Sequence, residues 1–180
     1  MNTDHPLQTL GSRSFPHQRK GLLGVVVGMG LALGLIFLPS SPLAIVRADF
    51  LYGLDRTDAA LALYDQIAEQ SLVEGQRMKA LRRGAGIWAL AKGNDVEARK
   101  RWEALAKQSP NRAEQAMAWE RVGYFHSQQG RHPELAAQAY ERSATLYHRD
   151  DKAAEQWMEA GSHWEKALNI ERATQVWLTV

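Results

Sequence analysis

A pair of residues, one small and one aromatic, recurs along this chain at an almost constant interval. Each pair has an alanine followed four positions later by an aromatic residue, and the pairs are Ala60 and Tyr64, Ala98 and Trp102, Ala136 and Tyr140, and Ala173 and Trp177. The alanines are 38, 38 and 37 residues apart. Because residues four apart lie on one face of a helix, each pair predicts one helix with a small and a large contact residue. An interval of this length indicates repeated helical units that bury their apolar faces only against one another.

A second helix is expected before each of the last three pairs. Small residues occupy matching places in these segments, at Ala85-Gly86, Val122-Gly123 and Ala160-Gly161. From residue 44 onward the apolar residues recur at helical spacing, and no run alternates with the period of a strand. Residues rich in Gly, Pro, Asn and Asp predict breaks between helices at 53–55, 93–95, 109–111, 130–133 and 148–151.

Together these motifs resemble the tetratricopeptide repeat, in which W-x2-L-G-x2-Y is followed by A-x3-F and a proline. The best match is Trp157-x2-Ala160-Gly161-x2-Trp164, followed by Ala173-x3-Trp177. The resemblance covers about residues 44–180 and implies an all-α solenoid of about four helix-turn-helix repeats. The interval near 38 exceeds the 34 that is usual in the family, which implies longer loops or longer helices.

The resemblance also implies a binding surface. In this family, residues of the first helix of each repeat line a concave groove, and the matching positions are Arg83, Ile87, Glu120, Arg121, Tyr124, Gln128, Met158, Glu159 and Ser162. This mixture suits an extended or helical peptide. The Asn and Lys pattern with which some members hold a terminal carboxylate is missing, and Ile87, Tyr124 and Ser162 stand where Asn would be expected. The alternative is a solvated face without a ligand.

The last residues form a second candidate surface. The final repeat motif ends at Trp177, and no polar capping helix follows Trp177, Leu178 and Val180. We expect them to contact a protein partner or a second copy of the chain, or else to fold back on the preceding helix.

The N-terminal part differs from the repeats. Residues 1–20 are polar and basic, which predicts a disordered cytoplasmic tail. Residues 21–38 carry no charge and, as a helix of about 27 Å, would just cross a bilayer, which predicts a transmembrane signal anchor. Basic residues before the span predict a single-pass protein of the bacterial inner membrane, with residues 39–180 in the periplasm. The alternative is a signal peptide cleaved near 46–48.

Composition excludes several classes of function. A net charge of +2 argues against nucleic-acid binding by bulk charge, and the absence of cysteine excludes thiolate metal sites and cysteine nucleophiles. Glu155, Glu159 and His163 lie four apart, but such spacing is common in helices, so no metal site is predicted. No catalytic set is recognisable, and neither an enzyme nor a cofactor is expected.

Tryptophan and charge add two further expectations. Most of the six tryptophans occupy repeat positions typical of the core, and Trp88 is the best candidate for an exposed one.

The charges are unevenly distributed along the repeats, because residues 76–107 are basic and residues 134–180 lean acidic. Such a dipole would attract a charged partner; the alternative is that these charges only form a solvated surface.

The sequence therefore predicts a non-catalytic, membrane-anchored adaptor or scaffold that acts in an envelope complex. One alternative is a permanent structural subunit of a membrane complex. The other is a secreted periplasmic repeat protein that binds peptide or glycan.

Overall fold

The computed structural model describes residues 41–147 and 151–180, and most of these residues are helical. They form eight helices: α2 (Ala44–Gly53), α3 (Thr57–Gln70), α4 (Glu74–Leu90), α5 (Asp95–Gln108), α6 (Arg112–Gln129), α7 (Pro133–Tyr147), α8 (Asp151–Lys166) and α9 (Ile170–Trp177). No strand occurs in this part of the chain, so the all-α prediction is confirmed. The predicted tail at 1–20 and span at 21–38 lie outside the described residues. Within those residues, no helix combines the length and the apolarity needed to cross a bilayer.

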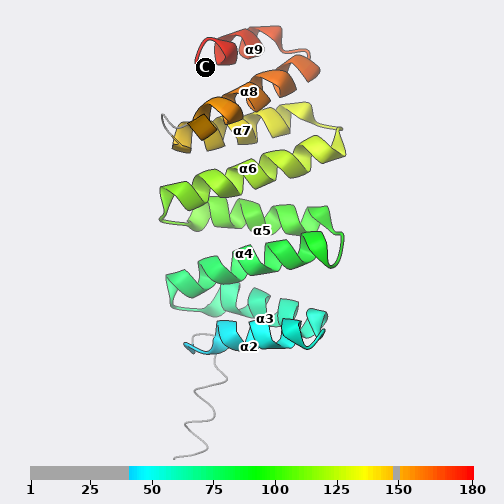
Figure 1. The fold of residues 1–180 in the computed structure, drawn as a ribbon, viewed down its shortest axis with the longest axis vertical. Helices are drawn as coiled ribbons and strands as arrows, with labels where there is room; N and C mark the ends of the chain where they lie inside the picture. Colours follow the sequence, from blue (N-terminus) through cyan, green and yellow to red (C-terminus); the bar gives the residue numbers. More distant parts are fainter. Residues whose placement is uncertain (1–40, 148–150) are drawn as a thin grey trace, which may run out of the picture. The chain divides into compact units, whose positions relative to one another are not determined.

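The helices pack in chain order, each against the one before and the one after it (Figure 1). Four antiparallel pairs result, namely α2 with α3, α4 with α5, α6 with α7, and α8 with α9. The apolar core is divided in the same serial way into three clusters. The first joins α2, α3 and α4, the second joins α4 to α7, and the third joins α7, α8 and α9. This arrangement is compatible with a helical solenoid.

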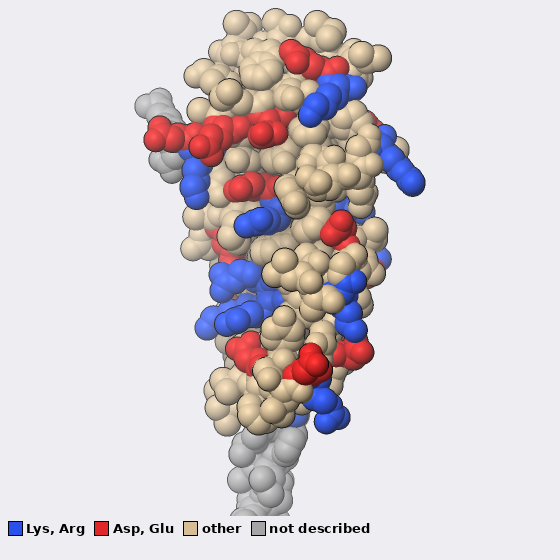
Figure 2. All heavy atoms as spheres, turned by 45° about the vertical axis from the view of Figure 1, so that its right-hand side comes forward, with Lys and Arg blue, Asp and Glu red and all other residues tan. Residues whose placement is uncertain are grey.

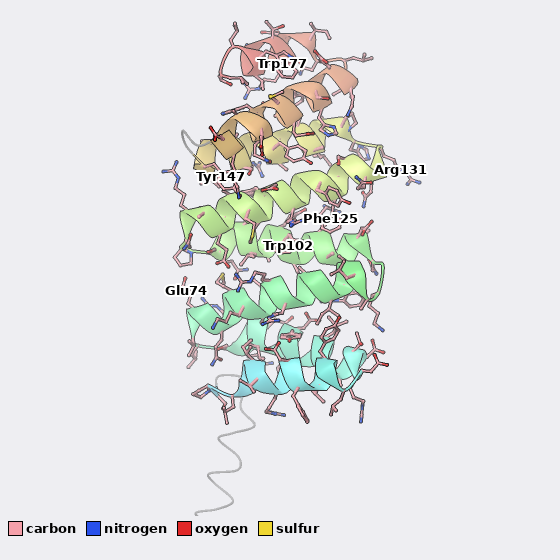
Figure 3. The ribbon with its side chains drawn as sticks, viewed as in Figure 1. Glu74, Trp102, Phe125, Arg131, Tyr147 and Trp177 are labelled. Carbon is pink, nitrogen blue, oxygen red and sulfur yellow. The ribbon has the colours of Figure 1, made fainter. Side chains whose placement is uncertain are left out.

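The recurring alanines are buried in the core. Ala60, Ala98 and Ala136 have no exposed surface, and Ala173 has 2%. A small side chain lets two helices approach, and the aromatic side chain four residues later fills the space beside it. Figure 3 shows Trp102 of α5 and Phe125 of α6, which belong to the same buried cluster.

Two of these helix pairs approach so closely that only glycine fits. A Cβ atom added at Gly123 of α6 would lie 2.9 Å from the ring of Tyr140 in α7. A Cβ atom added at Gly161 of α8 would lie 2.7 Å from the ring of Trp177 in α9. The two contacts occupy equivalent places in successive helix pairs, which supports a structural repeat.

Asparagine residues cap the starts of three helices, and glycine residues follow the ends of two. The side chains of Asn94, Asn111 and Asn169 accept hydrogen bonds from backbone N–H groups at the starts of α5, α6 and α9, at 2.9 to 3.1 Å. These bonds satisfy donors that the first turn of a helix leaves free. Gly93 and Gly130 follow α4 and α6 with φ of 58° and 62°, the left-handed conformation that favours glycine.

The connections before α4 and α6 repeat each other in detail. Ser71 and Ser109, both 2% exposed, lie 38 residues apart, and each serine Oγ accepts from the backbone N–H two residues ahead. Each Oγ also donates to the side chain five residues ahead, from Ser71 to Gln76 at 3.1 Å and from Ser109 to Glu114 at 2.7 Å. No break was expected from the sequence at 71–73, but α3 ends at Gln70 and α4 begins at Glu74.

Candidate functional site

A groove of about 520 Å³ lies between α6 and α8, with one residue of α7 on its wall. It is the hollow in which most of the predicted binding residues meet. Its lining comes from α6 at Glu120, Arg121, Tyr124, Ser127 and Gln128, from α7 at Tyr140, and from α8 at Glu155, Gln156, Met158 and Glu159. We call this hollow the α6–α8 groove.

Six of the nine residues that the family resemblance singled out line the α6–α8 groove. They are Glu120, Arg121, Tyr124, Gln128, Met158 and Glu159. Their shared position follows from the repeat, because helices one pair apart present the same face beside each other. That these side chains bind a partner stays a prediction.

The other three predicted residues lie elsewhere. Ile87 is only 6% exposed and belongs to the cluster of α2, α3 and α4, so it does not line a groove. Arg83 is exposed beside α2, where its Nε lies 3.7 Å from Asp49 Oδ1. Because α2 packs over this face of α4, the position equivalent to Tyr124 is buried there. Ser162 is half-buried on α8 and does not line the groove either.

A second hollow of about 540 Å³ adjoins the first on the other side of α6. Arg121 and Tyr124 line both hollows. The remaining lining is mostly apolar and comes from Gly86, Ala89, Leu90, Asp95, Trp102, Met117 and Phe125. The two hollows therefore offer one run of surface from α4 to α8, apolar towards α4 and charged towards α8.

One carboxylate of the groove, that of Glu120, is held by a tyrosine. The Tyr147 hydroxyl donates to Glu120 Oε2 at 3.2 Å, and burial, followed by the charge of Glu120, raises the Tyr147 pKa to about 12. Burial also raises the pKa of the Tyr140 hydroxyl, and the charges of Glu159 and Glu120 add to the effect. Both shifts keep the tyrosine hydroxyls protonated, so Tyr147 acts as a hydrogen-bond donor to Glu120.

Gln156 lines the groove although the sequence did not predict it as a binding residue. It is 6% exposed, it lines the groove, and its Oε1 makes no hydrogen bond within the described part of the chain. The matching positions in the preceding first helices are Ala118 and Leu81, which are both buried and apolar. A polar side chain at a position where the other repeats use an apolar one was the signal that could have identified it.

Acidic side chains gather over α8 (Figure 2). The figure shows an acidic row that follows this helix, whose exposed acids include Asp151, Glu155 and Glu159. Basic side chains gather nearer α4, where Lys79 and Arg82 are exposed. Across residues 41–147 and 151–180, no cluster of three or more His, Cys, Asp or Glu side chains has the geometry to hold a metal ion.

The tryptophans differ in part from their expected burial. Trp88 is half-buried against the first two core clusters, and the Arg101 guanidinium lies over its ring at 5.2 Å from the centroid. Trp177 is the more exposed residue, at 39%, beside Leu178 at 83% and Val180 at 58%. The prediction that Trp88 is the best candidate for an exposed tryptophan is therefore wrong, because the Arg101 guanidinium and the neighbouring core clusters cover its ring.

No protein-family model matches the sequence, and no curated protein matches it closely enough to count as a relative.

Proposed function

We propose that this chain is a tetratricopeptide-type adaptor that holds a segment of a partner protein in the α6–α8 groove. The observation that supports the proposal most is the meeting of Tyr124, Met158 and four other predicted residues around one hollow. Grooves between neighbouring helices commonly receive an extended or helical peptide, whose side chains fill the hollows.

Exposed apolar side chains in the groove favour a bound segment over a solvated face. Tyr124 is 46% exposed and Met158 is 53% exposed, although both lie in a hollow of the surface. Aromatic and methionine side chains are enriched at interfaces, where they contribute a large apolar contact area. A partner segment that covers them would therefore gain hydrophobic free energy.

We further propose that residues 21–38 anchor the adaptor in the bacterial inner membrane and that the repeats act in the periplasm as part of an envelope complex. The support is the uncharged run itself and the basic residues before it. Extraction of membranes with alkaline carbonate tests the anchor. The full-length chain should stay in the membrane pellet, and its release into the supernatant would overturn this part of the proposal.

The experiment for the binding role compares two tyrosine substitutions in the full-length chain. Tyr124→Ala removes a ring from the groove, whereas Tyr52→Ala removes one from α2 that is 42% exposed and so similarly accessible. Both variants should lose less than about 1 kcal/mol of unfolding free energy, because neither ring is buried. Tagged protein is purified from membranes in mild detergent, and the proteins that copurify are identified.

We expect one partner to be lost from Tyr124→Ala and retained by Tyr52→Ala. Equal recovery with both variants would overturn the role of the groove. A cooperative loss of helicity in Tyr124→Ala alone would show that the residue supports the fold and not a ligand.

A further inference from the structure

The α6–α8 groove has the charge and the hydrogen-bonding groups to recognise a basic side chain. We propose that its occupant is a partner segment carrying a lysine or arginine, whose cationic group lies between α6 and α8. This inference rests on the proposed function, because it names the chemistry of the segment that the groove holds.

Acceptors outnumber positive charges in the groove. Three carboxylates line it, from Glu120, Glu155 and Glu159, against the single guanidinium of Arg121. Within residues 41–147 and 151–180, Glu120 and Glu155 form no ion pair, and Glu159 reaches only the His163 ring, at 4.0 Å. Carboxylates that no internal cation neutralises attract a cationic ligand, and a hollow surface strengthens that field.

The histidine beside Glu159 does not supply the missing charge. His163 is 5% exposed and its ring stacks on Tyr140, with 5.6 Å between the ring centroids. Burial, followed by the charge of Lys166, lowers the pKa of His163, so the ring is neutral near pH 7. The His163 ring therefore does not neutralise the Glu159 carboxylate.

Gln156 supplies an independent observation that points to a ligand. Its Oε1 is buried in the groove wall without a hydrogen-bond donor among the described residues. A buried acceptor without a partner costs about 1–3 kcal/mol, so such groups are rare in native proteins. A lysine ammonium or an arginine guanidinium has only donors to offer, and it would satisfy this oxygen as well as the carboxylates once the Gln156 amide turns towards the groove.

The apolar residues of the groove fit the stem of the same side chain. Tyr124 and Met158 offer an exposed aromatic ring and a thioether chain beside the acidic groups. Lysine and arginine bury their methylene stems along apolar surfaces and stack on aromatic rings. Because the adjoining hollow towards α4 is mostly apolar, an apolar residue of the partner would lie there and the basic one towards α8.

The test measures binding of short fluorescein-labelled peptides to the full-length chain in neutral detergent, by fluorescence anisotropy. The probes share a glycine–serine background with two leucines, and differ only in carrying arginine, glutamine or glutamate at the same positions. We expect the arginine probe to bind about tenfold tighter than the glutamine probe, and added salt to reduce that advantage.

Variants that remove charges test whether the tighter binding of the arginine probe comes from the groove. Glu155→Gln with Glu159→Gln should bring the affinity for the arginine probe down to that of the glutamine probe. The control, Glu165→Gln with Glu171→Gln, removes the same net charge from exposed positions outside the groove and should change the affinity less than about threefold. Gln156→Met keeps the volume and removes the acceptor, so it should weaken the arginine probe several-fold without lowering the melting temperature.

The outcomes separate this inference from the proposed function. If the glutamine or glutamate probe binds as tightly as the arginine probe and Tyr124→Ala weakens it, the basic occupant is overturned and the peptide groove stands. If no probe binds but a copurifying partner still depends on Tyr124, the basic occupant is again overturned. If neither a probe nor a partner depends on Tyr124, both proposals fail.

Discussion

Single residues decide how closely the helices approach. Gly123 and Gly86 occupy equivalent positions in successive first helices, yet their surroundings differ. A Cβ atom at Gly123 would collide with the Tyr140 ring, whereas a Cβ atom at Gly86 would meet nothing within 4 Å. The same substitution should therefore have opposite effects at two equivalent positions.

We predict that Gly123→Ala destabilises the fold by about 1–3 kcal/mol, because the methyl group overpacks the contact between α6 and α7. Gly86→Ala is the matched control and should stabilise by about 0.5–1 kcal/mol, since alanine lowers the entropy cost of a helix interior. Urea unfolding of both variants measures these changes. Equal effects of the same sign at both positions would contradict the packing described for Gly123.

Two buried histidines make the stability depend on pH. Burial, followed by the charge of Arg99, lowers the pKa of His126 below its ordinary value of 6.5, and the Arg99 Nη1 lies 3.4 Å from His126 Nε2. The pKa of His163 is also lowered by burial. Below about pH 6.5 the unfolded chain thus binds more protons than the folded chain, so stability is present above that pH and is lost as pH falls.

We predict that the free energy of unfolding falls when the pH is lowered from about 7.5 to about 5.5, and that His126→Gln reduces this fall. Urea titrations at both pH values test this. A wild-type chain that is as stable at the lower pH would contradict the account of the two histidines.

At the scale of elements, Arg101 joins three helices. Its guanidinium, on α5, donates two bonds of 2.7 Å from Nη2 to the Asp65 carboxylate of α3 and lies over the Trp88 ring of α4. It also forms an ion pair of 2.9 Å with Glu97 on its own helix. The Arg101 side chain is only 14% exposed, so water screens these charges less than those at an open surface.

We predict that Arg101→Lys costs about 1–2 kcal/mol of stability, because an ammonium cannot form the two-pronged contact or stack in the same way. Lys100→Gln is the control, since Lys100 also pairs with Glu97, at 2.7 Å, but is 62% exposed. That change should cost less than about 0.5 kcal/mol. The melting temperatures of the two variants test this prediction. Equal decreases in both variants would contradict the role of Arg101 in joining the three helices.

At the scale of the whole molecule, sequence periodicity predicted the elements well and the binding surface only in part. The interval near 38 residues predicted the helix pairs because alanine and glycine must recur wherever two helices touch. The interval did not predict that α2 covers Ile87, because α2 lacks the small-residue motif that marks α4, α6 and α8. The break between α3 and α4 was not predicted, because residues 71–73 include no Gly, Pro or Asn. Ser109 nevertheless forms the same turn 38 residues later. The unpaired oxygen of Gln156 depends on packing that only coordinates reveal.

The central claim is that the groove between α6 and α8 binds a segment of a partner protein. Site-specific photocrosslinking in native membranes tests it most directly, with benzoylphenylalanine in place of Gln128, which lines the groove, or of Gln66, an exposed residue of α3. We predict a discrete crosslinked product from position 128 that is lost when Glu155→Gln and Glu159→Gln are added, and no such product from position 66. Equal crosslinking from both positions, or no product from position 128, would contradict the claim.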